Sequence, residues 1–249
     1  MKFVDSVLKM HSAVEVAVIL NSGKEQFTES FFSRERLHIY DYGENLGYMQ
    51  AAAEGLKEYL SNNLLPSWII LSNTDISFPD DGFFEKLSKD KRHDFILAPD
   101  IVSSDGIHQN PFLINRPSKN KLLMLSRINS HPLLASLYSL LAKIKGRIKS
   151  STKRVKPESS FIYAPHGSFI IIGDQYFKRG ESLDHPAFLY GEELFIAERA
   201  RRSHISVYYD EGYKIHHAEH VTTAKMSTKF KADALRNSLD IVIQKYYNR

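Results

Sequence analysis

The sequence predicts an α/β fold in which helices cover a doubly wound, mainly parallel sheet. Short apolar runs alternate with segments whose apolar residues recur at helical spacing, and this order is typical of parallel strands joined by crossover helices. The runs 68–71 and 168–172 are almost wholly apolar, which indicates strands buried on both faces. A chain of 249 residues is long enough to bury the core of one such domain.

The elements follow in chain order from these periodicities and from turn residues. The turns are predicted at Asn21-Ser-Gly23, Gly173-Asp174 and Glu211-Gly212, because Asn, Asp and Gly favour turns. We predict helices at 3–10, 48–60, 82–87, 191–202 and 232–247, and strands at 14–20, 37–40, 68–71, 94–98, 168–172 and 205–209.

A leucine-rich segment interrupts the alternation. It predicts a helical hairpin, inserted at about 120–156 in a single domain of residues 1–249 that ends in a helix at about 230–248. An apolar face flanked by Lys and Arg is typical of a helix that rests on an anionic membrane surface. The alternative is an ordinary helix packed on the domain. The apolar face would comprise Leu133, Leu134, Leu137, Leu140, Leu141 and Ile144.

The composition limits the function classes. The absence of cysteine excludes disulfides and thiolate metal sites. No run of about 18 apolar residues occurs, so we expect a soluble or peripherally attached protein. Net charge is only +4, but seven basic residues crowd one window, which favours an anionic partner or a solvated face. They are Lys143, Lys145, Arg147, Lys149, Lys153, Arg154 and Lys156.

The buried strand at 68–71 leads directly into polar residues, Asn73 and Asp75. Ligands gather at the carboxyl ends of such strands, and a carboxylate there suits a hard divalent cation completed by substrate phosphates. The alternative is a plain turn before Pro79. The sequence therefore offers Asp75 as a candidate metal ligand.

A second candidate site lies in Phe188-Leu-Tyr-Gly-Glu-Glu, where Glu192 and Glu193 open a helix. Acidic residues in a first helical turn often only complement the helix dipole. Two adjacent carboxylates near an apolar wall also repel each other, which raises the pKa of one and suits it to act as a general base.

Two further motifs are weaker. Ile215-His-His-Ala-Glu-His220 follows a predicted strand and offers metal ligands, although each histidine by itself is more often structural. Gly167, in Ala164-Pro-His-Gly-Ser-Phe169, allows a backbone to approach a ligand closely.

Taken together and in this order, the motifs resemble the family 2 inverting glycosyltransferases of the GT-A fold, especially the rhamnosyltransferase-like branch that builds bacterial surface polysaccharides. The resemblance spans about residues 3–220. The matching segments are Asn45-Leu-Gly47, Asn73-Thr-Asp75, Gly167-Ser-Phe-Ile-Ile-Ile172, Phe188 to Arg199, and His216.

The resemblance implies a role for each matching residue. Asp75 would hold a divalent cation, Mn²⁺ or Mg²⁺, against the diphosphate of a UDP- or dTDP-sugar donor, with His216 near the metal or phosphate. Glu193, beside Glu192, would take the proton from the acceptor hydroxyl. The donor site would also include Asn45, Gly47, Asn73 and Gly167.

The chain departs from the family pattern at three places. It starts within the helix that follows the family's first strand, Asn21 stands where an aspartate is usual, and the acidic pair is Glu-Glu instead of Glu-Asp. These departures leave open an alternative reading, a non-catalytic GT-A-like partner or scaffold protein with an incomplete donor site. An exposed sheet edge left by the missing strand would favour a homo-oligomer.

The resemblance also implies where the protein works and on what. We expect a cytoplasmic enzyme of surface polysaccharide synthesis, peripheral on the inner face of the cell membrane, whose acceptor is a glycan or a lipid-linked glycan. A nucleic-acid partner is not expected, because no recognised nucleic-acid motif accompanies the basic segment.

Overall fold

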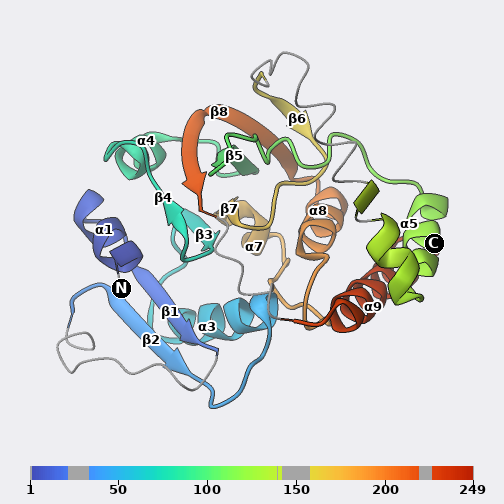
Figure 1. Cartoon of the computed structure of the whole chain (residues 1–249). Helices are drawn as coiled ribbons and strands as arrows, with labels where there is room; N and C mark the ends of the chain where they lie inside the picture. Colours follow the sequence, from blue (N-terminus) through green and yellow to red (C-terminus); the bar gives the residue numbers. More distant parts are fainter. Residues whose placement is uncertain (1, 22–33, 139, 142–157, 219–225, 249) are drawn as a thin grey trace.

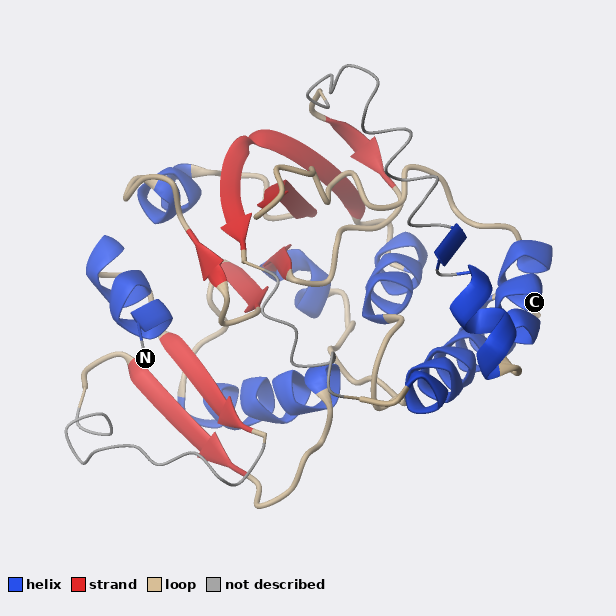
Figure 2. Cartoon of the chain, in the orientation of Figure 1, coloured by secondary structure: helices blue, strands red, loops and turns tan. Residues whose placement is uncertain are grey.

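The computed structural model describes residues 2–21, 34–138, 140–141, 158–218 and 226–248, and the predicted α/β class is confirmed. Helices pack on both faces of two sheets (Figures 1 and 2). The basic segment 143–156 and His220 lie outside the described residues. No helix in the described part of the chain is long and apolar enough to span a bilayer.

The larger sheet is built around β7 (Phe169–Gly173) and β5 (Phe95–Ser103). Its strand order is β3-β7-β5-β8-β4, with β6 (Ser160–Ile162) also paired to β8. β5 and β8 are parallel, whereas β7 is antiparallel to both β3 and β5. The three strands β3 (Trp68–Ser72), β5 and β8 (Ser206–His217) therefore share one direction, and the start of β7 lies beside the end of β3. The short β4 (Ile76–Ser77) pairs antiparallel with β8.

The side chains of the central strands alternate between two apolar clusters. Ile96 and Ile172 face one cluster, and Leu97 and Ile171 face the other. All four are fully buried, and burying each side chain stabilises the fold by about 1.5–3 kcal/mol. This explains why the apolar runs at 94–98 and 168–172 were predicted correctly as strands.

A smaller sheet of two parallel strands, β1 (Val16–Leu20) and β2 (Leu37–Asp41), lies beside α3 (Tyr48–Asn62). A Cβ at Gly55 of α3 would stand 2.7 Å from the Ile19 side chain, so the helix approaches the sheet closely. The other flanking helix, α1 (Lys2–Met10), is tied to this sheet by Arg36, whose guanidinium donates to the carbonyls of Leu8, His11 and Val14.

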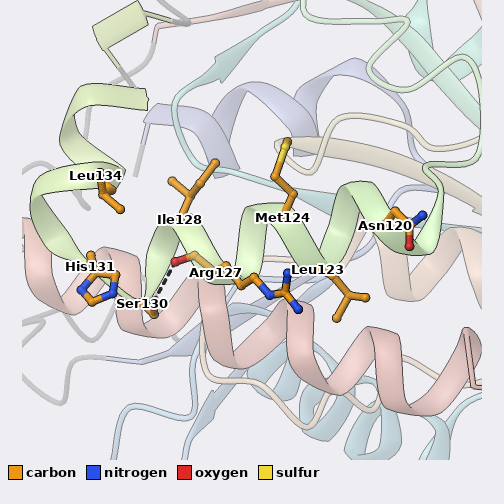
Figure 3. Close-up of a pocket in the computed structure, with 8 residues that line it drawn as sticks. All are labelled: Asn120, Leu123, Met124, Arg127, Ile128, Ser130, His131 and Leu134. Atoms are coloured by element: carbon orange, nitrogen blue, oxygen red, sulfur yellow. Dashed lines mark hydrogen bonds between the residues drawn. The ribbon is translucent and has the colours of Figure 1, made fainter.

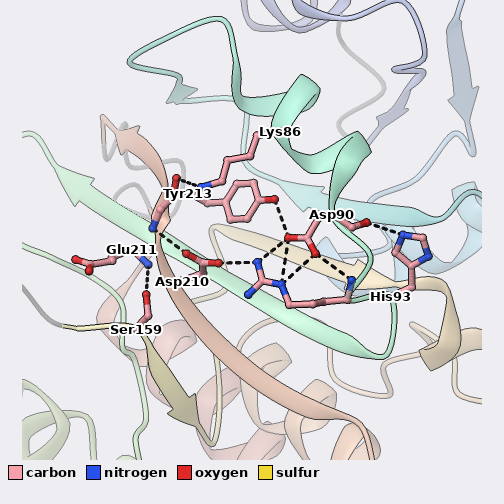
Figure 4. A network of polar contacts seen from close by, with 9 residues as sticks. Lys86, Asp90, His93, Ser159, Asp210, Glu211 and Tyr213 are labelled. Carbon is pink, nitrogen blue, oxygen red and sulfur yellow. Dashed lines mark hydrogen bonds and ion pairs between the residues drawn. The ribbon is translucent and has the colours of Figure 1, made fainter.

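β8 is longer than predicted. The predicted turn at Glu211-Gly212 is instead a bulge within β8. Pro99 of β5 pairs with Asp210, and the next residue, Asp100, pairs with Lys214, so residues 211–213 have no partner in β5. Polar contacts hold the bulge against α4 (Phe83–Lys89) and the loop after it (Figure 4).

At the centre of these contacts Arg92 donates to Asp90 and Asp210, at 2.6 Å each. Burial raises the pKa of Asp90, but hydrogen bonds from Arg92 outweigh this and lower it to about 2. Tyr213 also donates to Asp90 at 2.9 Å, and Lys86 donates to the carbonyl of Gly212 at 2.6 Å.

Helices close the opposite end of the molecule. α5 (Lys119–Asn129) lies along α9 (Thr228–Tyr246), and both pack on α8 (Glu192–Arg202) through Leu122, Phe195 and Val242. The short α7 (Asp174–Lys178) follows β7, at a position where only a turn was predicted.

α9 also contacts the residues immediately before α8. Ser238 donates to the carbonyl of Tyr190 at 2.8 Å. A Cβ at Gly191 would stand 2.0 Å from Ser238 Oγ, and Gly191 has a φ of +81°, so this position requires glycine. The start of α8 is therefore held by the last helix.

Candidate active site

The end of β3 and the start of β7 meet at one edge of the larger sheet. The Asn73 amide donates to the carbonyl of Ser168 at 2.9 Å, which continues the β3–β7 pairing past the strand ends. Asp75 follows two residues later, and its carbonyl accepts from Ala218 at 3.0 Å. The β3–β7 pairing therefore brings Asn73 to Ser168, and the β4–β8 pairing brings Asp75 to the end of β8.

The histidine that meets Asp75 is His217. Its Nε2 lies 3.3 Å from Asp75 Oδ1, and both side chains are largely buried. His217 Nδ1 lies 2.8 Å from Gln109 Oε1, and this contact orients the ring so that Nε2 faces Asp75. The sequence reasoning named His216, but that side chain is exposed on the opposite face of β8.

The acidic pair lies against Gly167. A Cβ at Gly167 would stand 2.8 Å from Oε1 of Glu192 and 2.8 Å from Oε1 of Glu193. The Gly167 amide also donates to Glu193 Oε1 at 3.3 Å. Because glycine has no side chain, residue 167 leaves the space that both carboxylates occupy.

The electrostatics of this pair suit proton transfer. Burial raises the pKa of Glu193 well above its usual value, and the neighbouring charge of Glu192 raises it further. Burial also raises the pKa of Glu192. Two carboxyl groups so close cannot both ionise freely, so one of them holds a proton more tightly than an ordinary glutamate does.

Tyr48 and His166 complete the surroundings of Gly167. The Tyr48 hydroxyl donates to the Gly167 carbonyl at 3.2 Å, and its pKa is raised by burial and by the two glutamates. His166 Nδ1 is 2.9 Å from Ser168 Oγ, and the ring centroid of His166 is 6.1 Å from that of His217. Burial lowers the pKa of His166 to about 4, so this ring is neutral at pH 7.

The loop with Asn45 and Gly47 positions Tyr48, the first residue of α3. Asn45 Oδ1 accepts from the Gly47 amide at 2.9 Å. Asn21 accepts from the Leu46 amide at 2.8 Å and donates to the Gly47 carbonyl at 3.0 Å. Asn21, where an aspartate was expected, thus fixes this loop. Gly47 has a φ of +80°, and a Cβ there would stand 2.1 Å from the Phe188 carbonyl oxygen.

The segment 166–168 therefore links the two halves of the predicted site. On one side Ser168 pairs with Asn73, and the His166 ring approaches His217. On the other side Gly167 holds the acidic pair. Sequence reasoning missed Tyr48, Gln109 and His166. His166 stood in a motif that had been singled out for its glycine, while nothing local in the sequence marks the other two.

Asp75 and His217 present a carboxylate oxygen and an imidazole nitrogen to each other, and both are ligand types that divalent cations take. A diphosphate and water would supply the other ligands of such a cation. Within the described residues no group of three or more His, Asp or Glu side chains could hold a metal ion. The side chains fit a cation that a substrate shares, but not a closed structural site.

Comparisons with known proteins agree with this fold. No protein-family model matches the chain. It is 23% identical over 200 residues to the low-salt glycan biosynthesis hexosyltransferase Agl10 of Haloferax volcanii, covering 80% of this chain and 57% of the relative. The solved structure of GalNAc-T7 with UDP, GalNAc and Mn²⁺ matches 98% of this chain and 45% of that one, with a TM-score of 0.60 and 13% identity.

The chain has a GT-A-like fold. The structural match confirms this prediction, and the sequence match is a weak homology to a hexosyltransferase. The chain spans little more than half the length of Agl10 and under half that of GalNAc-T7.

Proposed function

We propose that the protein is a glycosyltransferase that moves a sugar from a nucleotide-diphosphate donor to a glycan or lipid-linked glycan acceptor. One observation carries the proposal. The segment 166–168 holds a candidate diphosphate–cation site, at Asp75 and His217, next to a carboxylate pair with raised pKa values. The hexosyltransferase relative and the UDP and Mn²⁺ of the structural neighbour support the same donor class.

The reaction needs an acceptor oxygen to attack the anomeric carbon while the nucleoside diphosphate leaves. Glu193 accepts the proton of the acceptor hydroxyl, because a raised pKa makes it a stronger base than an ordinary glutamate. Glu192 keeps that pKa high through its own charge. Attack by the acceptor itself, with no enzyme nucleophile, inverts the anomeric configuration.

The donor diphosphate would lie at the Asp75 side of the site. Asp75 and His217 would hold Mn²⁺ or Mg²⁺, and we assign the histidine role to His217 and no longer to His216 because of its contact with Asp75. The bound cation supplies positive charge for the leaving diphosphate. The backbone around Asn45, Gly47, Asn73 and Gly167 shapes the rest of the donor site.

Calorimetric titration with UDP and with dTDP, each with and without Mn²⁺, tests the donor site. We expect cation-dependent binding that is lost in Asp75→Ala. Asp81→Ala is a matched control, because Asp81 is exposed six residues later, in the loop after β4. No binding of either nucleotide would reject a donor site and favour a non-catalytic partner protein.

A second experiment tests the base. Glu193→Gln is nearly isosteric and should abolish transfer while the dissociation constant of the nucleotide stays within about twofold. Glu192→Gln should retain measurable transfer with a pH profile moved to lower pH, because the neighbouring charge no longer raises the pKa of Glu193. Unchanged turnover in Glu193→Gln would remove this residue from the mechanism, and a product of retained anomeric configuration would reject direct displacement.

A further inference from the structure

A short helix after α5 presents leucines to solvent. Its described residues are 132–138 and 140–141, and we call it the leucine helix. Leu133 is 84% exposed, Leu137 53%, and Leu140 and Leu141 56% each. Pro132 and Ala135, on the other side, are less exposed. The prediction left open whether this apolar face packs on the domain, and the described leucines are about half exposed or more.

The exposed leucines form one continuous face. At 100° per residue, positions 133, 134, 137, 140 and 141 fall within about 120° of the helix circumference. A contiguous apolar face of this kind on a water-soluble surface marks an interaction site. The small residues opposite it allow the helix to lie close to the rest of the protein with its leucines outward.

A groove continues this apolar face over α5 (Figure 3). It has a volume of about 640 Å³ and is lined by Leu123, Met124, Ile128 and Leu134, together with Arg127 and His131. Most groove-lining positions of α5 lie opposite Leu122, which belongs to the same buried apolar cluster as Leu194. α5 therefore has the groove on its solvent-exposed side, and Leu194, the residue after Glu193, lies on its buried side.

Positive charge predominates on α5 itself. Residues 106–157 contain no Asp or Glu and eleven Lys or Arg, of which the four at 116–127 are described and the seven at 143–156 are not. One acidic side chain of the neighbouring helix, Asp240 of α9, contacts α5 by accepting from Ser126. Lys119, Lys121 and Arg127 are exposed on α5. Exposed leucines beside a net positive charge match the chemistry of an anionic bilayer surface, whose acyl boundary takes apolar side chains and whose headgroups attract Lys and Arg.

We propose that the leucine helix and the outer face of α5 dock on an anionic lipid bilayer. A second copy of the chain is a poorer occupant, because pairing through this face brings like charges together. A nucleic acid would pair with the positive charge but would leave the leucines exposed to water. Docking through α5 places the acidic pair close to the membrane, and with the proposed function this suits an acceptor carried on a lipid.

Vesicle co-sedimentation of the full chain, without nucleotide, tests the proposal. We expect binding to vesicles with about one third phosphatidylglycerol and little binding to pure phosphatidylcholine. The triple variant Leu133→Ser, Leu137→Ser, Leu140→Ser should bind the anionic vesicles at least tenfold more weakly. Leu64→Ser is the matched control, because Leu64 is 91% exposed and lies on a different part of the surface.

Three outcomes would overturn the proposal. The first is equal vesicle binding by the triple variant, and the second is no binding of the wild type to anionic vesicles. The third is a wild-type dimer, seen in sedimentation velocity, that the triple variant does not form, because this result would assign the face to a second copy. The assay uses neither donor nor cation. Asp75→Ala should therefore bind vesicles like the wild type, and a failed donor titration leaves this test unaffected.

Discussion

The substitution Gly167→Ala should lower activity at the acidic pair while leaving the stability of the protein nearly unchanged. The new Cβ would stand 2.8 Å from one oxygen of Glu192 and of Glu193, whereas ordinary contacts begin near 3.4 Å, so each carboxylate must move by about 0.6 Å. These oxygens are the far ends of flexible side chains, the next contact is Glu192 Cγ at 3.0 Å, and residue 167 does not have a positive φ. The free energy of unfolding should therefore change by less than about 1 kcal/mol.

Activity should respond differently, because a displacement of about 1 Å at a reacting group can cost about 100-fold in rate. We expect kcat for nucleoside diphosphate release from the donor sugar to fall by about 10- to 100-fold. Gly82→Ala is the matched control, since its Cβ would meet only an oxygen of Asp80, at 3.2 Å. Turnover within twofold of wild type in a folded Gly167→Ala would refute the proposed position of the base, and a loss of more than about 2 kcal/mol in urea would refute the assumed flexibility.

Other predictions concern stability. Gly47→Ala should lower the free energy of unfolding in urea by more than about 2 kcal/mol, because it adds strain at a positive φ to a clash with the Phe188 backbone; a smaller loss would contradict the geometry of this loop. Glu198→Ala should lower the free energy of unfolding by about 3–5 kcal/mol, since Glu198 is fully buried and accepts from Arg116 and from other donors. A variant that unfolds near the wild-type temperature would contradict this expectation. Burial lowers the pKa of His166 and of His185 to about 4. The unfolded chain therefore binds these protons near pH 6.5 while the folded chain does not, and stability should fall between pH 6.5 and pH 4 by up to about 3 kcal/mol for each histidine; a flat profile of unfolding free energy over this range would be inconsistent.

The sequence was most informative where burial alone decides the structure. The apolar runs at 68–71 and 168–172 became neighbouring strands, because an all-apolar segment of this length is stable only inside a covered sheet. Their antiparallel pairing was not predicted, since strand direction depends on the path of the chain between them. That pairing brings Ser168 beside Asn73.

The histidine of the predicted site was chosen by resemblance, as a histidine that follows a predicted strand, and not by the direction of its side chain. Because Glu211-Gly212 was predicted to be a turn, no strand was predicted across residues 215–217. In the structure β8 continues to His217, and the alternation of strand side chains puts Ile215 and His217 on the inner face and His216 on the outer one. A bulge, which keeps a strand going across turn residues, cannot be distinguished locally from a turn.

Asn21 illustrates a different limit. Its position after a strand was compared with an aspartate in the resembled family, and no local pattern gives it a partner. Its partners, the backbone groups of Leu46 and Gly47, lie 25 and 26 residues away in the chain. Contacts of this range depend on how β1 and α3 pack, which a single sequence does not specify.

The contact between α9 and the residues before α8 has a consequence for local unfolding. Glu192 and Glu193 follow Gly191, whose place is set by Ser238 of α9, whereas Asp75 and His217 are held by strands of the larger sheet. Undocking of α9 therefore removes the support of the acidic pair and leaves the contact between Asp75 and His217 in place. The two parts of the candidate site differ in the element whose opening would disable them.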